Sequence, residues 1–198
     1  MHTHIGDWAL LEQTTAWGVV LEAHTCERLL RYLALLYEAN QRVNLTRVPA
    51  EQAVGRHLLD SLCLLAVYTP PEGARVLDIG TGAGLPGIPL AVARPDLRLT
   101  LLDSHGKTVQ FLREACAALG LPATVVQARA EEWAHNSDAR EQFDLAQRRR
   151  LGLQQLHQSH HGSGQRLKRL DRSSNLSSCH YSNRHRSTGY YGCLHSYS

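Results

Sequence analysis

The sequence predicts an α/β protein in which a parallel sheet with crossover helices follows a helical N-terminal region. Two helical apolar patterns precede Pro70. Beyond the Pro70–Gly73 break, short apolar runs of about strand length alternate with helical patterns, which is typical of a parallel sheet. A chain of 198 residues can bury a sizeable core and favours one domain over two.

The first two predicted elements are amphipathic helices within a helical cap, residues 1–70. Residues 26–43 and 50–68 each carry leucines at helical spacing, among them Leu29, Leu33, Leu36, Leu58, Leu62 and Leu65. Their apolar faces predict packing against the rest of the domain.

The predicted sheet has four strands, in a core domain of residues 71–146. The strands are expected at 75–79, 97–103, 124–128 and 143–146. Between them we expect a helix starting near Pro86, a second from Gly106 to Leu119 that Gly120 stops, and a short third near Glu131.

The composition changes abruptly after residue 146. Residues 1–146 hold 12 Lys+Arg against 17 Asp+Glu, whereas residues 147–198 hold 9 against 1. The second part has no Ala, Val or Ile, although the first has 35 of them, and its serines rise to 10. Since such a segment cannot supply buried strands, the sheet is expected to be incomplete after its fourth strand.

Two interpretations of residues 147–198 stay open. One is a disordered basic tail, and the other is translation from a shifted reading frame of a GC-rich gene. Either way an unpaired apolar sheet edge would remain, so we expect the chain to fold poorly or lack activity. Cys179, Cys193 and the tail histidines lack the spacing of a zinc site, so no metal is expected.

A glycine-rich turn between the first strand and its helix predicts a cofactor site. Gly80, Gly82 and Gly84 let the backbone turn tightly and let a ligand approach closely. Asp103 ends the next strand, where a carboxylate can accept both ribose hydroxyls of an adenosine group. Asp78 would repel a pyrophosphate and suits a cofactor with a cationic amino-acid group. The pattern therefore favours S-adenosylmethionine over NAD.

Several motifs carry a family resemblance from about residue 25 to Ala146. They are the segment VLDIGTGAGLPGIPL, the Asn44-Leu45-Thr46 run, and Arg56-His57 followed by Asp60-Ser61. With these motifs the chain resembles the glucose-inhibited division protein B family, the 16S ribosomal RNA guanine-N7 methyltransferases. The resemblance implies a Rossmann-like S-adenosylmethionine-dependent fold and methyl transfer to a guanine of the small ribosomal subunit.

The resemblance also implies site residues. By position, Gly80 and Leu85 match cofactor-contacting residues of the glycine loop, which also contains Gly82, and Asp103 matches the ribose-binding acid. Ala130 and Glu131 match the loop beside the adenine, and Arg149 falls on a family arginine, although its sequence context is foreign. No catalytic side chain is identified, because guanine N7 already presents a lone pair and needs no general base.

Two other functions remain as alternatives, an NAD-dependent oxidoreductase that uses the same glycines and a non-enzymatic RNA-binding remnant that uses the basic tail. Arg42, Arg47, Arg56 and Lys107 are candidates for phosphate contacts. Five cysteines without pairing motifs, no export signal and no membrane span predict a cytoplasmic protein, expected to be a monomer.

Overall fold

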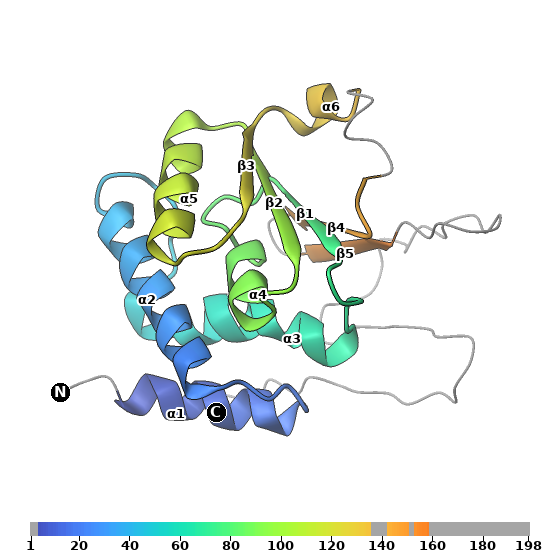
Figure 1. The fold of residues 1–198 in the computed structure, drawn as a ribbon. Coiled ribbons are helices and arrows are strands. Elements are labelled where there is room, and N and C mark those ends of the chain that lie inside the picture. Colours follow the sequence, from blue (N-terminus) through green and yellow to red (C-terminus); the bar gives the residue numbers. More distant parts are fainter. Residues whose placement is uncertain (1–3, 136–141, 151–152, 159–198) are drawn as a thin grey trace. The chain divides into compact units, whose positions relative to one another are not determined.

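A five-stranded sheet forms the centre of the fold (Figure 1). The computed structural model describes residues 4–135, 142–150 and 153–158, which lie in one unit formed by residues 1–159. The strand order is β3-β2-β1-β4-β5, in which the first four strands are parallel and β5 is antiparallel to β4. The strands are β1 Arg75–Ile79, β2 Arg98–Asp103, β3 Thr124–Gln127, β4 Leu145–Arg150 and β5 Leu153–Gln158. The predicted α/β class is confirmed.

The strand order reverses direction at β1. The chain moves outward from β1 through β2 to β3, then returns to place β4 on the other side of β1. In a parallel sheet the carboxyl ends of such strands share one edge, and a ligand typically binds where the order reverses. That edge receives the loop after β1 and the residues that end β2 and β3.

Two layers of helices cover one face of the sheet. Helices α4, Gly87–Ala93, and α5, Gly106–Ala118, pack directly on the strands, and α2, Ala23–Asn40, packs across both (Figure 1). Fully buried Leu29, Leu36, Ile88, Leu101 and Leu112 join these layers into one apolar core. Within the described residues, no helix combines the length and hydropathy that a membrane crossing needs.

Helix α1, His4–Ala16, was not predicted from the sequence. It packs against α2, with Leu10 and Thr14 completely buried and the Thr14 hydroxyl donating to the Leu10 carbonyl. The helical pattern in the sequence is weak here, because the part of α1 whose side chains are described buries only two residues. Two residues are too few to show a helical spacing of apolar positions.

The second predicted helix is divided. Residues 50–68 form a short 3-10 turn at Ala50–Gln52, a π-helical turn at Val54–Leu59 and then α3, Asp60–Val67. The Ser61 hydroxyl donates to the His57 carbonyl, and His57 Nδ1 lies 3.2 Å from the Arg56 carbonyl oxygen. The side chains of Ser61 and His57 thus contact backbone carbonyl oxygens of the π-helical turn. The spacing of apolar residues gives no information about such contacts.

The sheet does not stop at Ala146, so the expectation of a sheet that ends with its fourth strand is wrong. Strand β4 runs on to Arg150, and β5 pairs with it from Leu153 to Gln158. Backbone hydrogen bonding between strands does not require β-branched side chains, which is why composition misled here. The remainder of the predicted basic tail, from residue 159 on, lies outside the described residues.

Candidate functional site

The loop after β1 turns through left-handed backbone conformations. Gly80, Gly82 and Gly84 have φ angles of +64°, +56° and +90°. The Gly80 amide donates to the Leu102 carbonyl at 2.8 Å, and the Gly84 amide donates to the Thr81 carbonyl at 3.0 Å. Residues other than glycine rarely adopt these backbone angles. The three glycines of the sequence therefore make this turn possible.

The four glycines of the motif fall into two groups. A Cβ atom at Gly80 or Gly82 would meet no heavy atom within 4 Å, so these two residues border open space. A Cβ at Gly84 would approach Ile88 Cγ1 to 2.8 Å, and one at Gly87 would approach Asp78 Oδ2 to 2.8 Å. The first pair leaves room for a ligand, and the second pair permits the helix to pack closely.

Asp103 joins the end of β2 to this loop. Its Oδ2 accepts the Gly82 amide at 2.9 Å, and its Oδ1 accepts the His105 amide at 2.9 Å. The residue is 7% exposed. The structure therefore brings Asp103 and Gly82, two of the predicted site residues, together at the edge where β1 and β2 end.

Asp78 lies beneath the loop. The residue is fully buried, and its Oδ2 accepts hydrogen bonds from the Thr81 hydroxyl at 2.7 Å and from the Gly87 amide at 2.9 Å. These contacts hold both ends of the loop on β1. Its expected attraction for a cationic cofactor group stays a prediction, because the described contacts of this carboxylate are within the protein.

The remaining predicted residues divide between core and surface. Leu85 is only 2% exposed and belongs to the apolar core. Ala130 and Glu131 begin the short helix α6, Ala130–Trp133, just after β3, with Ala130 half-buried and Glu131 exposed. Figure 1 shows α6 at the edge where β3 ends and α5 begins. Both residues thus lie on the sheet edge that carries the glycine loop.

The backbone of Arg149 reaches the same edge. Strand β4 pairs with β1 in a register that places Arg148 opposite Ile79, so Arg149 follows one residue later, at the level of Gly80. In the sequence, this arginine corresponds to the family arginine only by its position, in a foreign context. The register gives its position a structural basis.

A second group of polar contacts orders the Asn44–Arg47 segment. Asn40 Oδ1 accepts the Leu45 and Thr46 amides at 2.8 and 2.9 Å. The Thr46 hydroxyl lies 2.9 Å from Nε2 of His57, which is 2% exposed. The same Thr46 hydroxyl oxygen accepts the Val48 amide at 3.1 Å. His57 therefore acts as a satisfied core histidine that ties this segment to the π-helical turn.

The candidate phosphate-binding residues are all on the surface. Arg42, Arg47, Arg56 and Lys107 are exposed. Arg47 and Arg56 directly adjoin Thr46 and His57, so the bond between those two residues brings their segments together. The structure thus brings the segments of two of the four candidates, Arg47 and Arg56, together.

Sequence reasoning missed one contact to the loop. The Tyr32 hydroxyl, on α2, donates to the Ala83 carbonyl at 2.7 Å, and Tyr32 is fully buried. A separation of 51 residues leaves no local signal in the sequence. The bond between Thr81 and Asp78, in contrast, joins residues three apart and could have been anticipated.

Other concave regions do not coincide with this site. A cavity of about 420 Å³ opens at the amino ends of the strands, where Arg75, Arg98, Thr100 and Thr124 line it. Among the described residues, no group of three or more His, Cys, Asp or Glu side chains could hold a metal ion.

A protein family model matches more than half of the chain. Residues 25–161 match the family model GidB, described as rRNA small subunit methyltransferase G. The match ends at residue 161 rather than at Ala146, where the sequence analysis placed the end of the resemblance. It thus includes β4 and β5.

Curated relatives of the chain carry the name ribosomal RNA small subunit methyltransferase G. The protein of Moorella thermoacetica is 43% identical over 136 residues, which are 68% of this chain and 57% of the relative. That of Thermoanaerobacter pseudethanolicus is 41% identical over 142 residues, 71% of this chain and 59% of the relative. The matched part of the chain thus spans less than two thirds of these relatives.

Among solved structures, a SAM-dependent methyltransferase from Aquifex aeolicus is 25% identical, with a TM-score of 0.33 over 50% of this chain and 48% of that chain. The fold assignment rests on the strand order, and the family assignment on the sequence match. By that match, the chain belongs to the GidB family of rRNA small subunit methyltransferases G.

Proposed function

We propose that this protein uses S-adenosylmethionine to methylate N7 of a guanine in 16S ribosomal RNA. The observation that carries the proposal is the open space in front of Gly80 and Gly82, beside the Asp103 carboxylate. A glycine loop at this edge lets a nucleoside approach the backbone, and an acid at the end of β2 can accept its ribose hydroxyls. The family match supports the methyl donor over a dinucleotide.

Bound S-adenosylmethionine supplies an electrophilic methyl group on a sulfonium. The guanine N7 lone pair forms the new N–C bond while the S–C bond breaks and its electrons stay on sulfur. The purine then carries the positive charge, and no proton leaves. The chain's own residues therefore act by placing the reactants in line, which is a large part of many enzymatic rate enhancements.

The RNA partner would meet the basic surface of Arg42, Arg47, Arg56 and Lys107. All four side chains are exposed and can neutralise phosphates. The His57–Thr46 bond fixes the backbone that carries two of them. We propose the small ribosomal subunit or its RNA as the substrate, and a monomeric, cytoplasmic enzyme.

Calorimetric titration tests the cofactor. We expect S-adenosylmethionine and S-adenosylhomocysteine to bind and NADH not to bind. Asp103→Asn should weaken S-adenosylmethionine binding by about tenfold or more, since it removes a charged acceptor. Glu114→Gln, which neutralises an exposed carboxylate on α5, is the matched control and should bind as the wild type does. Tighter binding of NADH would favour the oxidoreductase instead.

Methyl transfer is tested on small subunits from a strain that lacks the corresponding methylation. N7-methylguanine is detected by cleavage of the RNA chain after reduction and aniline treatment. A new cleavage site in 16S RNA supports the proposal. Cofactor binding without any modified guanine in naked RNA or subunits, both by this chain and by a chain with an Ala- and Val-rich frame restored after residue 146, would contradict the substrate part alone.

We also propose that part of residues 147–198 is translated from a shifted frame, so that the chain as written has little activity. Gln147 supports this: it is 3% exposed in β4, and neither polar atom of its side chain has a hydrogen-bond partner among the described residues. Resequencing the DNA from codon 140 past codon 161 tests it. A frame that restores Ala- and Val-rich strands supports the shift, and its absence from every frame leaves a genuine basic tail.

A further inference from the structure

We propose that Tyr32 is a positioning residue that fixes the cofactor loop from the helical cap. This inference rests on the proposed function, because it assigns a role at the same cofactor site. The Tyr32 hydroxyl donates to the Ala83 carbonyl at 2.7 Å and comes from α2, far away in the sequence.

Among the residues that the structure describes, Asp78, Asp103 and Tyr32 hold the loop through side-chain hydrogen bonds, and Tyr32 is the distant one in sequence. Asp103 accepts the Gly82 amide, and Asp78 accepts the Thr81 hydroxyl and the Gly87 amide. Asp78 belongs to β1, from which the loop emerges, and Asp103 ends the neighbouring strand β2. Tyr32 instead holds the carbonyl between Gly82 and Gly84, at the middle of the turn.

The position of this anchor matters because its neighbours have left-handed φ angles. A peptide between two such glycines has many alternative orientations, since glycine imposes little restriction of its own. A hydrogen bond to the intervening carbonyl selects one orientation of the Ala83–Gly84 peptide. It thereby sets the loop surface at Gly82 that borders open space.

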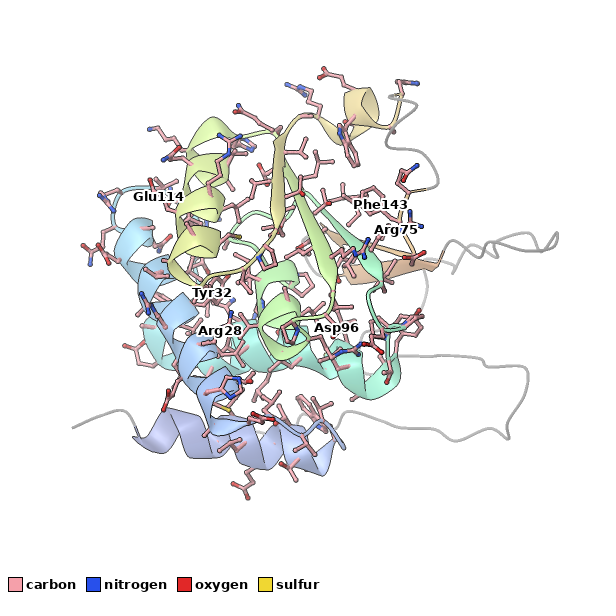
Figure 2. The ribbon with its side chains drawn as sticks, in the orientation of Figure 1. Arg28, Tyr32, Arg75, Asp96, Glu114 and Phe143 are labelled. Atoms are coloured by element: carbon pink, nitrogen blue, oxygen red, sulfur yellow. The ribbon has the colours of Figure 1, made fainter. Side chains whose placement is uncertain are left out.

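Tyr32 is itself held rigidly. The residue has no exposed surface and lies in the apolar core with Leu29 and Leu36. One turn earlier on α2, Arg28 Nη2 donates to the Leu119 carbonyl at 2.8 Å, which attaches α2 to the end of α5. Figure 2 shows Arg28 and Tyr32 on the side of α2 that faces α4. The hydroxyl therefore acts as a fixed donor.

The first experiment compares Tyr32→Phe with Tyr37→Phe. Both variants remove a tyrosine hydroxyl from α2, but the hydroxyl of Tyr37 donates to the Val48 carbonyl, outside the loop. Calorimetry well below the melting temperature measures S-adenosylmethionine affinity, and thermal unfolding is measured beside it. We expect Tyr32→Phe to weaken binding about threefold to tenfold and Tyr37→Phe to leave it unchanged. Equal affinity in both variants, whatever their melting temperatures, would overturn the role.

A second measurement needs no variant and covers the case in which Tyr32→Phe does not fold. Hydrogen exchange of the wild-type chain is followed by mass spectrometry with and without S-adenosylmethionine. Because coupling is reciprocal, we expect binding to slow exchange in the loop and also in the part of α2 around Tyr32, but not in α1. Protection confined to the loop would overturn the inference.

Failure of the proposed function gives a different result. If the wild-type chain binds no S-adenosylmethionine, the cofactor assignment itself fails. If the wild type binds and the Tyr32→Phe variant binds equally well, only the role of Tyr32 fails.

Discussion

Glycines of one motif serve different purposes at the level of single residues. Gly80 and Gly82 border open space, whereas Gly84 and Gly87 lie against side chains of the core. The spacing of glycines is therefore compatible with both ligand binding and close helix packing. The two roles can be distinguished only by the atoms that lie around each glycine in the folded structure.

Gly84→Ala tests the packing purpose. Its Cβ would contact Ile88 and Leu112 at a φ of +90°, so strain and overpacking should together lower the free energy of unfolding by about 2–4 kcal/mol. Gly55→Ala is the control, because a Cβ there meets nothing within 4 Å and its φ is not positive. Urea unfolding measures both variants, and equal stabilities would contradict the packing argument.

Asp96 predicts a dependence of stability on pH. The hydrogen bond from the Arg94 side chain, helped by the Gly73 amide and the Arg94 charge, holds the pKa of the Asp96 carboxyl below its ordinary value of 3.8. A pKa lowered by folding gives stabilisation that is complete above the unfolded pKa and is lost as the pH falls through the folded pKa. The contribution should therefore be complete above about pH 4 and be lost progressively as the pH falls below 3.8 through the lowered pKa.

Asp96→Asn removes this contribution. We expect it to lower the free energy of unfolding at pH 7 by about 1 kcal/mol or less, because the pair is partly exposed. Between pH 5 and pH 2.5 the melting temperature of the wild type should fall more steeply than that of the variant. Glu114→Gln controls for the loss of one charge, and parallel curves for wild type and Asp96→Asn would refute the assignment.

At the level of secondary structure elements, β4 is hydrogen-bonded through its backbone to strands on both sides, but its sequence places a polar side chain in the interior. It pairs with β1 on one side and β5 on the other, yet it buries Gln147 opposite Asp78 in the register. A buried amide without hydrogen-bond partners costs about 1–3 kcal/mol. Natural strands at the centre of a parallel sheet are apolar for this reason.

Gln147→Val should therefore stabilise the protein. We expect the free energy of unfolding to rise by about 1–3 kcal/mol, because the substitution removes the unsatisfied amide and adds a β-branched side chain to a central strand. Gln127→Val in β3, where the residue is exposed, controls for strand propensity alone. Chemical denaturation measures both, and a loss of stability in Gln147→Val would show that the amide has a partner in solution.

For the whole molecule, ligand binding and folding are coupled. A cofactor that binds only the folded chain adds stability in proportion to the logarithm of its concentration. At a hundred times the Kd, S-adenosylmethionine should add about 2.7 kcal/mol and raise the melting temperature, whereas NADH at the same concentration should not. A melting curve without a cooperative transition would instead support the expectation that this chain folds poorly.

The order of the central elements could be predicted because it depends on local patterns. The strand at 75–79 was predicted with the observed bounds, and the helix of α5 and the short α6 were also predicted close to their observed positions. Helix α1 and the π-helical turn were missed, because their boundaries depend on few buried residues and on side chains that bond to carbonyls. Apolar periodicity carries no information about either.

By itself the sequence determined the glycine loop and the acid at the end of the next strand, since left-handed turns require glycine and parallel strands end at one edge. The tertiary structure alone decided that Tyr32 bonds to the middle of the loop and that β4 continues past Ala146. The physical reason is distance along the chain. A contact across 51 residues, or a strand paired with two others, depends on packing that no local pattern encodes.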